Sequence, residues 1–452
     1  MTRRAAALGA LLLCGSGCGP WQRVGSTDAP RVGTTLPRLF DATSVYRSMG
    51  FLVGGGALPF VASVRYLRGP VPDSTLALFA LSLANTAITF QRSGPEFVAQ
   101  YRLEATFRVD SGSDPVRQIA RDEQVRVRSF QETLRGDESV IFQQFVTLPP
   151  GAYRVTVMVR DRNGPAFARA ERIDTAPRFR SPGITRPIPI YEGQGRSQPT
   201  ALPALLVNPR STLPYGTDSV RFYIEGYGHA AGARLIGRVV DAADRELWRD
   251  TVSLRGDPGL ASALVAVAPS RLPVGRADFE ATLGGDTTRT PFLVSFSNQW
   301  VITNFDEMLS LLRYFDRQAW VDSLRKVSPE ERLTVWQAFW KATDPVVITP
   351  ENEALDDYFR RVQQANARFL DEGEPGWLTD RGEVFITLGE PDEVLDMSSG
   401  MDRSGLRIIR WTYTNQRLVL YFQDQSGFNH FRLTPTSRSE FQRVLARVRR
   451  SR

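Results

Sequence analysis

Residues 148–161 read LPPGAYRVTVMVRD, a Pro-Gly turn that leads directly into an alternating strand. Every second residue of this strand is apolar, from Tyr153 to Val159. Such alternation places the apolar side chains on one face of a sheet and the polar ones on the other. A turn that feeds a strand of this kind is typical of the late hairpin in an immunoglobulin-like β-sandwich.

Other short alternating segments surround this hairpin. Leu103, Ala105 and Phe107 recur at every second position in one of them, and Leu76, Leu78 and Ala80 in an earlier one. Several short strands separated by turn residues predict a two-sheet fold. We therefore predict a first immunoglobulin-like β-sandwich over residues 58–176.

The same turn and strand recur 124 residues later, as Leu272-Pro273-Val274-Gly275 followed by alternating residues up to Leu283. Upstream, Val220–Ile224 and Leu235–Val240 have the composition of strands. We predict a second, tandem sandwich over residues 184–297. Such modules either bind ligands or partners through loops and edge strands, or act as spacers.

Near residue 298 the apolar period changes from 2 to 3.6, which predicts helices. An apolar stripe extends from Phe305 to Trp320, and Ser328-Pro329 and Thr349-Pro350 are start signals for two further helices. The predicted strands are residues 383–388, 407–413, 417–422 and 431–433, and a last helix begins near Ser439. Residues 298–452 are thus predicted to form an α+β domain, with helices packed on a small antiparallel sheet.

The N-terminus has the layout of a signal peptide. Arg3 and Arg4 precede a nine-residue apolar segment, Ala5–Leu13, and small residues lead to Cys18. This pattern resembles a bacterial lipobox, so we expect residues 1–17 to be removed and Cys18 to be lipidated. An ordinary cleaved signal peptide without a lipid is the alternative. Residues 18–57 are expected to form the lipid anchor and a tether.

Composition excludes several classes of site. The histidines are His229 and His430, and the cysteines are Cys14 and Cys18. Zinc fingers, iron–sulfur sites, Cys–His nucleophile pairs and a disulfide framework in the body of the chain are therefore excluded. We expect no metal site and no cofactor. The formal charge is +7, but the arginines are scattered among Asp and Glu residues and form no basic stripe. A nucleic-acid partner is therefore not expected either.

A short polar turn precedes the strand predicted at 383–388, and its residues are Gly376, Trp377, Leu378, Thr379, Asp380, Arg381 and Gly382. A catalytic interpretation makes Asp380 a general base and Arg381 an anion clamp, with Thr379 nearby, but spacing identifies no nucleophile with its base. The structural interpretation is favoured. In it Trp377 fills the gap between helix and sheet, Thr379 or Asp380 binds backbone N–H groups, and Arg381 pairs with a carboxylate. Gly382 would permit close approach of the strand.

These residues resemble the motif that names the GWxTD-domain proteins of bacterial envelopes. Phe339-Trp340-Lys341, Asp344-Pro345 and Leu388–Val394 are similar to other elements of that family, and the resemblance covers residues 298–450. The resemblance implies an exported, often lipidated protein and no known reaction.

The function expected from the sequence is that of a non-enzymatic, lipid-anchored envelope protein acting as a scaffold or partner-binding module. Its expected partners are the membrane, through the lipid, and another envelope protein. Gly19 after Cys18 resembles the pattern of outer-membrane lipoproteins, facing the periplasm or the cell surface. Two alternatives stay open: an envelope hydrolase or transferase with a site near Thr379-Asp380-Arg381, and carbohydrate binding by the sandwich loops.

Overall fold

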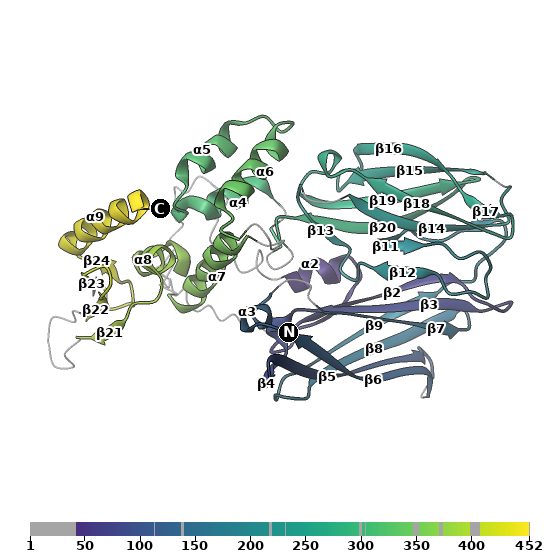
Figure 1. Cartoon of the computed structure of the whole chain (residues 1–452), viewed down its shortest axis with the longest axis horizontal. Helices are drawn as coiled ribbons and strands as arrows, with labels where there is room; N and C mark the ends of the chain where they lie inside the picture. The colour runs from purple at the N-terminus through teal and green to yellow at the C-terminus, as the bar shows by residue number, and fades with distance from the viewer. Residues whose placement is uncertain are drawn as a thin grey trace, which may run out of the picture.

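The structure is a computed structural model that describes residues 42–112, 114–136, 140–216, 219–230, 232–297, 301–302, 304–346, 352–369, 374–397 and 407–451. Stacked, mostly antiparallel sheets form one part, and helices with a small sheet form the other (Figure 1). The predicted signal peptide, Cys18 and the first half of the tether lie outside the described residues. Among the helices that are described, none has both the length and the apolar character needed to cross a membrane.

The end of the predicted tether is part of the fold, so the prediction of a tether through residue 57 is wrong there. It contains α2 (Ala42–Ser48) and β1 (Leu52–Gly54). Tyr46, Phe51 and Val53 are buried in a cluster that also includes Leu293 of the second sandwich. Burial of these apolar side chains lowers the free energy of the folded chain, and a solvated tether would leave them exposed to water.

The first sandwich consists of two sheets. One has the order β1-β2-β3-β7, and the other has the order β4-β5-β8-β9 with β6 paired to β5. The strands are β2 (Phe60–Arg68), β3 (Thr75–Leu83), β4 (Gln91–Ser93), β5 (Glu96–Val109), β6 (Pro115–Val127), β7 (Val140–Leu148), β8 (Gly151–Asp161) and β9 (Phe167–Ala176), with η1 (Asn85–Ala87) and α3 (Phe130–Thr133) in the connections. The strand predicted after the Pro-Gly turn is confirmed as β8, with its alternate apolar residues in the core.

The second sandwich also consists of two sheets. One has the order β12-β11-β14-β18-β17 with β10 paired to β14, and the other has the order β13-β20-β19-β15-β16. The strands are β10 (Gly183–Ile184), β11 (Ile188–Gln194), β12 (Ala204–Val207), β13 (Thr212–Pro214), β14 (Val220–Tyr227), β15 (Arg234–Asp241), β16 (Glu246–Ser253), β17 (Arg255–Asp257), β18 (Leu260–Val267), β19 (Gly275–Leu283) and β20 (Asp286–Ser295), with η2 (Pro269–Arg271) before β19. The recurrent turn and strand are thus confirmed as β19.

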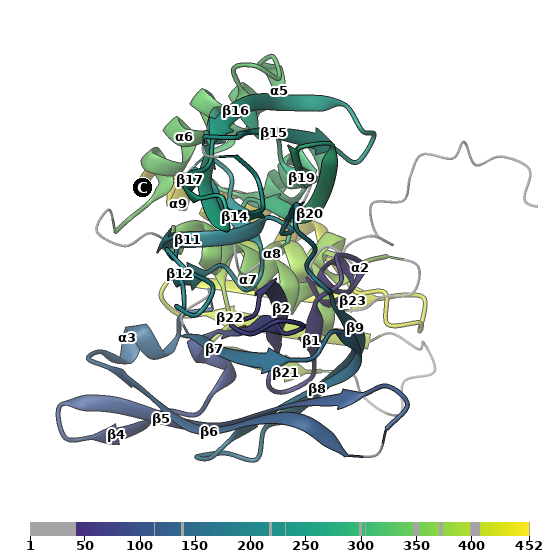
Figure 2. The same ribbon diagram turned by 90° about the vertical axis from the view of Figure 1, so that its right-hand side faces the viewer.

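The two sandwiches are stacked face to face (Figures 1 and 2). Strand β3 is buried at every position, since it is covered on both sides. Ala77, Phe79 and Leu81 pack inside the first sandwich, whereas the alternate residues of β3 pack against Ile188 and Ile190 of β11. Only half of the apolar residues of β3 therefore serve its own module.

A buried polar network crosses this junction. The side chains of Arg196 and Glu225 have no exposed surface, and Arg196 Nε donates to Glu225 Oε1 at 2.9 Å. Tyr223 and Tyr227 donate their hydroxyls to the two oxygens of the same carboxylate. Arg68 of the first sandwich joins the network through its backbone. Its carbonyl accepts from Arg196 Nη2 at 2.7 Å, and the backbone N–H of Arg68 donates to Tyr227 Oη at 2.9 Å. The network fixes the stacking with directional bonds that apolar contact alone would not supply.

The C-terminal part has helices on a sheet of order β21-β22-β23-β24. The helices are α4 (Phe305–Leu311), η3 (Leu312–Tyr314), α5 (Gln318–Lys326), α6 (Arg332–Thr343), α7 (Glu353–Arg368), η4 (Gly376–Leu378), α8 (Asp380–Leu388) and α9 (Pro435–Ser451). The strands are β21 (Glu393–Asp396), β22 (Arg407–Tyr413), β23 (Leu418–Asp424) and β24 (Arg432–Leu433). The strands predicted near 407–433 are confirmed, but the strand predicted at 383–388 is wrong because this segment is helix α8.

The helix starts predicted from Pro also differ from the structure. Helix α6 begins at Arg332, after a turn in which the Ser328 carbonyl accepts from the Glu331 and Arg332 N–H groups. Thr349-Pro350 lies outside the described residues. Helix α7 is instead capped by Asn352, whose side chain accepts from Leu355 N at 3.0 Å.

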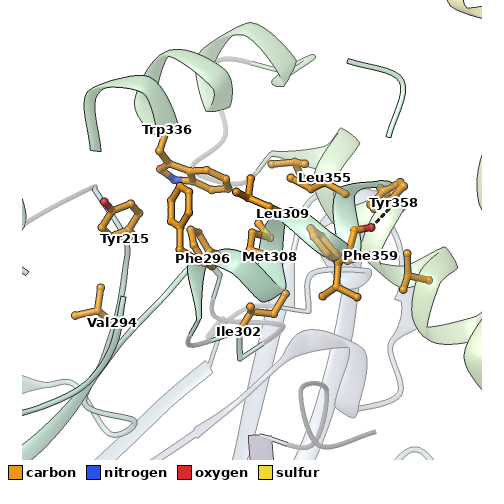
Figure 3. Close-up of a cluster of buried hydrophobic side chains, with 14 of the residues drawn as sticks. Tyr215, Val294, Phe296, Ile302, Met308, Leu309, Trp336, Leu355, Tyr358 and Phe359 are labelled. Carbon is orange, nitrogen blue, oxygen red and sulfur yellow. Dashed lines mark hydrogen bonds between the residues drawn. The ribbon is translucent and has the colours of Figure 1, made fainter. Parts of the chain in front are cut away.

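The second sandwich and the helices share one hydrophobic core (Figure 3). Phe296, which follows β20, lies with its ring centroid 4.7 Å from that of Trp336 on α6 and 5.7 Å from that of Phe305 on α4. Tyr215 of the sandwich lies 6.5 Å from the same Trp336. The boundary predicted at residue 298 therefore falls within a continuous core.

Candidate functional site

Two glycines of the 376–382 motif allow three backbone segments to meet. A Cβ at Gly376 would lie 2.4 Å from the carbonyl oxygen of Ala365 in α7, and a Cβ at Gly382 would lie 2.0 Å from the carbonyl oxygen of Gly376. Both distances are far inside van der Waals contact, so a side chain at either position would push η4 away from its neighbours. The close approach expected of Gly382 is confirmed, but it involves helix α8 rather than a strand.

Trp377 is buried, as predicted, with 1% of its surface exposed. Its ring lies edge-on to Tyr314 with the centroids 6.2 Å apart, and η4 packs against both α7 and α8. The side chain thus fills the space among helices, whereas the sequence predicted a wedge between helix and sheet. Its indole N–H has no hydrogen-bond acceptor among the described residues.

Thr379 explains why the following segment is a helix. Its hydroxyl accepts from Gly382 N at 3.0 Å and donates to the Gly376 carbonyl at 2.8 Å, which makes Thr379 the N-cap of α8. Asp380 and Glu383 lie in the first turn, where their negative charges interact favourably with the positive end of the helix dipole. Gly389, with a φ of 88°, ends the helix. A threonine cap, two early acids and a terminal glycine were the available sequence signals for this helix.

Asp380 connects α8 to β24, the last strand of the sheet, and to the helix α9 that follows it. Its Oδ2 accepts from Leu433 N at 2.7 Å, and its Oδ1 pairs with Arg438 of α9. The prediction that Asp380 bonds backbone or arginine within its own domain is confirmed. Glu383 pairs with the same Arg438 at 2.6 Å, so one guanidinium joins two carboxylates. Although burial acts against it, the hydrogen bond and charge of Glu383 together with the charge of Asp380 raise the pKa of Arg438.

Arg381 stacks on aromatic rings. Its guanidinium carbon lies 4.5 Å from the ring centroid of Phe431 and 5.4 Å from that of Phe369. Cation–π contacts of this kind hold a cation against a packed surface. The structure therefore places the Arg381 guanidinium against the aromatic residues that surround the motif.

Each motif side chain is engaged inside the domain. A cavity of about 500 Å³ in this domain is lined by Tyr314, Asp357, Tyr358, Arg361, Ile386 and Leu445 among others, and by no residue from Gly376 to Gly382. In the described part of the chain, no group of three or more His, Cys, Asp or Glu side chains is arranged to hold a metal ion. The arrangement is suited to holding α8, β24 and α9 together.

Replacing Asp380 with asparagine is expected to lower the free energy of unfolding by about 1–3 kcal/mol, because a buried charge-assisted network loses its anion. A thermal melt of the purified variant measures the loss, beside a complementation assay in the producing cells. An unchanged melt together with lost complementation would instead assign Asp380 a direct functional role.

Comparison with known proteins identifies the C-terminal part. No curated protein matches the sequence. Among solved structures, trypsin-activated alpha-2-macroglobulin from Escherichia coli is similar at 12% identity and a TM-score of 0.17; the similarity covers 54% of this chain and 18% of that protein. A family model described as the GWxTD domain matches residues 285–446. The predicted resemblance is confirmed: the chain carries a GWxTD domain, which begins at the turn before β20.

Proposed function

We propose that this chain is a non-enzymatic, lipid-anchored protein of the bacterial envelope, and that its GWxTD domain binds a partner protein through strand β21. The observation that carries the proposal is the exposure of this strand. All four residues of β21 are exposed, and it lies at the edge of its sheet. Val394, Leu395 and the following Met397 are 54%, 41% and 46% exposed.

The backbone of β21 is suited to strand addition. Met397 N donates to the Ile408 carbonyl of β22 at 2.8 Å. Since successive residues of an antiparallel strand point their N–H and C=O groups to opposite sides, Val394 directs its N–H and C=O toward the open edge. Exposed edges are often blocked by proline or by charged residues; β21 contains no proline or lysine, and its charged residues are Glu393 and Asp396 at its two ends. An extended partner segment with alternating apolar residues fits this edge.

The geometry of the motif supports a binding role rather than catalysis. Thr379 is fully buried, and its hydroxyl is occupied by the helix cap. Asp380 is held by Leu433 and Arg438. A nucleophile and base need access to substrate, which these contacts do not leave. The motif instead supports the platform that presents β21.

Val394→Pro tests the strand-addition proposal. Proline removes an N–H at the open edge and leaves the ladder to β22 in place, so folding is expected to persist. We expect the variant to lose its principal crosslinked partner in a pull-down from crosslinked cells, with an unchanged melting temperature. Leu395→Lys should act in the same direction.

Leu202→Lys is the matched control, because Leu202 is 61% exposed on the second sandwich, away from β21. It is expected to keep the wild-type crosslinks. Unchanged crosslinks in Val394→Pro and Leu395→Lys would refute the proposed site.

The lipid anchor is tested separately. Cys18→Ala is expected to move the protein from the membrane fraction to the soluble periplasmic fraction, since several acyl chains on one cysteine anchor stably. A wild-type protein that already fractionates as soluble without detergent would contradict the anchor.

A hydrogen bond at the start of β8 supports the proposed immunoglobulin-like character of the first sandwich. Tyr153 at the start of β8 donates its hydroxyl to the Pro149 carbonyl at 2.8 Å. A tyrosine that bonds backbone a few residues upstream is a recurrent feature of immunoglobulin-like folds. In this proposal the two modules extend the GWxTD domain from the membrane.

A further inference from the structure

A cleft of about 710 Å³ lies between the two sandwiches and is rich in arginine. Both modules contribute to its walls. Its charged lining residues are Arg65, Arg172, Asp174, Arg178, Arg180, Arg186, Asp286 and Arg289. Six arginines thus face two aspartates in one cavity, whose volume is in the range of small-molecule sites.

Some of these arginines are already neutralised. Arg289 pairs with Asp244 at 2.6 Å and with Glu280 at 2.7 Å. Arg178 pairs with Asp73 at 3.1 Å. These two guanidiniums therefore contribute little net charge to the cleft.

Three other arginines are not neutralised by an ion pair with a described residue. Within the part of the chain that the structure describes, no carboxylate lies at ion-pair distance from Arg65, Arg180 or Arg186. Arg172 is 4.0 Å from Asp174, which is the limit of an ion pair. Asp174 and Asp286 thus stand among the four remaining arginines, so the cleft has an excess of positive charge.

Arg65 shows what this arrangement of like charges costs. Burial lowers the pKa of Arg65 to about 10; the charge of Asp174 opposes that shift, whereas the charges of Arg172 and Arg186 add to it. Arg65 Nη2 donates to Ser211 Oγ at 2.9 Å, but its Nε has no acceptor among the described residues. Ser63 lies two residues earlier on β2 and is 4% exposed, and its hydroxyl also has no hydrogen-bond partner among the described residues. Buried donors without acceptors are costly, and a bound oxyanion would satisfy them.

We infer that this cleft binds a small organic anion, with a carboxylate or phosphate group held by Arg65, Arg180 and Arg186 and an apolar body against the wall. Guanidinium forks match the geometry of both oxyanions. Phe179 and Ile173, the latter 50% exposed, supply apolar surface in the same cavity. The site does not depend on β21, so it stands or falls apart from the proposed function.

Isothermal titration of the full mature protein tests the inference with four probes: phenyl phosphate, benzoate, inorganic phosphate and benzylamine. We expect phenyl phosphate or benzoate to bind with a Kd of about 1 mM or tighter, ahead of inorganic phosphate. Whichever of the two binds more tightly identifies the head group. Benzylamine, which has the apolar body but the opposite charge, should not bind.

Arg186→Gln and Arg180→Gln should each weaken the Kd about tenfold or more, since each removes a charge-assisted bond. Both residues are exposed at the rim, so the variants should fold, and a thermal melt checks this. Arg255→Gln, an exposed change of equal charge on β17 outside the cleft, is the control and should leave the Kd unchanged. Absence of binding by both organic anions, equal binding of inorganic phosphate, or an unchanged Kd in both cleft variants would overturn the inference.

Discussion

Trp377→Ala is expected to lower the free energy of unfolding by about 3–5 kcal/mol, the usual range for a buried tryptophan. The indole is almost fully enclosed among η4, α7 and α8, and a cavity there cannot collapse because Gly376 and Gly382 already hold the backbones in contact. The loss is a large fraction of the roughly 5–15 kcal/mol by which native proteins are stable. Chemical denaturation followed by near-ultraviolet circular dichroism measures it.

The shared core determines how far the damage extends. The first sandwich has a core of its own, whereas that of the second is continuous with the helices. Hydrogen exchange is therefore expected to show early loss of protection in α8 and β20, with β8 still protected. Trp320→Ala on α5, where the indole is half-buried, is the control and should cost less. A melt equal to that of the wild type would contradict the assigned role of Trp377.

Arg196→Met is expected to cost about 3–5 kcal/mol, because it leaves the Glu225 carboxylate buried without its cation. Both side chains have no exposed surface. The two tyrosine hydroxyls still donate to Glu225, but they cannot neutralise its charge. Urea denaturation monitored by intrinsic fluorescence should show the loss.

The double variant Arg196→Met, Glu225→Gln separates charge from packing. It should recover much of the lost stability, since the unpaired charge is gone. Arg154→Met breaks two solvent-accessible ion pairs, with Asp110 and Glu171, and should change the stability little. A double variant no more stable than Arg196→Met would show that packing, not charge, causes the effect.

Local patterns predicted most of the strands well. β8 and β19 followed from period-two alternation after a Pro-Gly or Val-Gly turn, because each has one face in a core and one in solvent. The same rule failed for Val384-Phe385-Ile386, whose three consecutive apolar residues are buried on several sides of a short helix. A short apolar run fits a strand or a buried helix equally well, so periodicity could not decide. The Thr379 cap could have decided it.

Contacts between distant segments were beyond the sequence. Arg196 and Glu225 are far apart in the chain, and buried arginine is rare enough that a solvated position was the natural prediction. The arginines of the cleft come from separate strands and loops of two modules, and only the stacking of those modules gathers them. Thr379, by contrast, bonds Gly376 and Gly382, each three residues away, so backbone bonding in this turn could be predicted. Asp380 was predicted to bond backbone or arginine, but its partners Leu433 and Arg438 lie on distant segments that the sequence could not name.

The continuous core under Phe296 and Trp336 also bears on how this architecture can be inherited. A recombination event that transferred only the helices to another protein would strip aromatic cover from the strands left behind. The family match starts before β20, a strand paired with β13 and β19, so the inherited unit includes part of its neighbour. Chimeras joined at residue 298 should therefore express poorly, whereas exchange of the whole stretch from β10 onward keeps that core together.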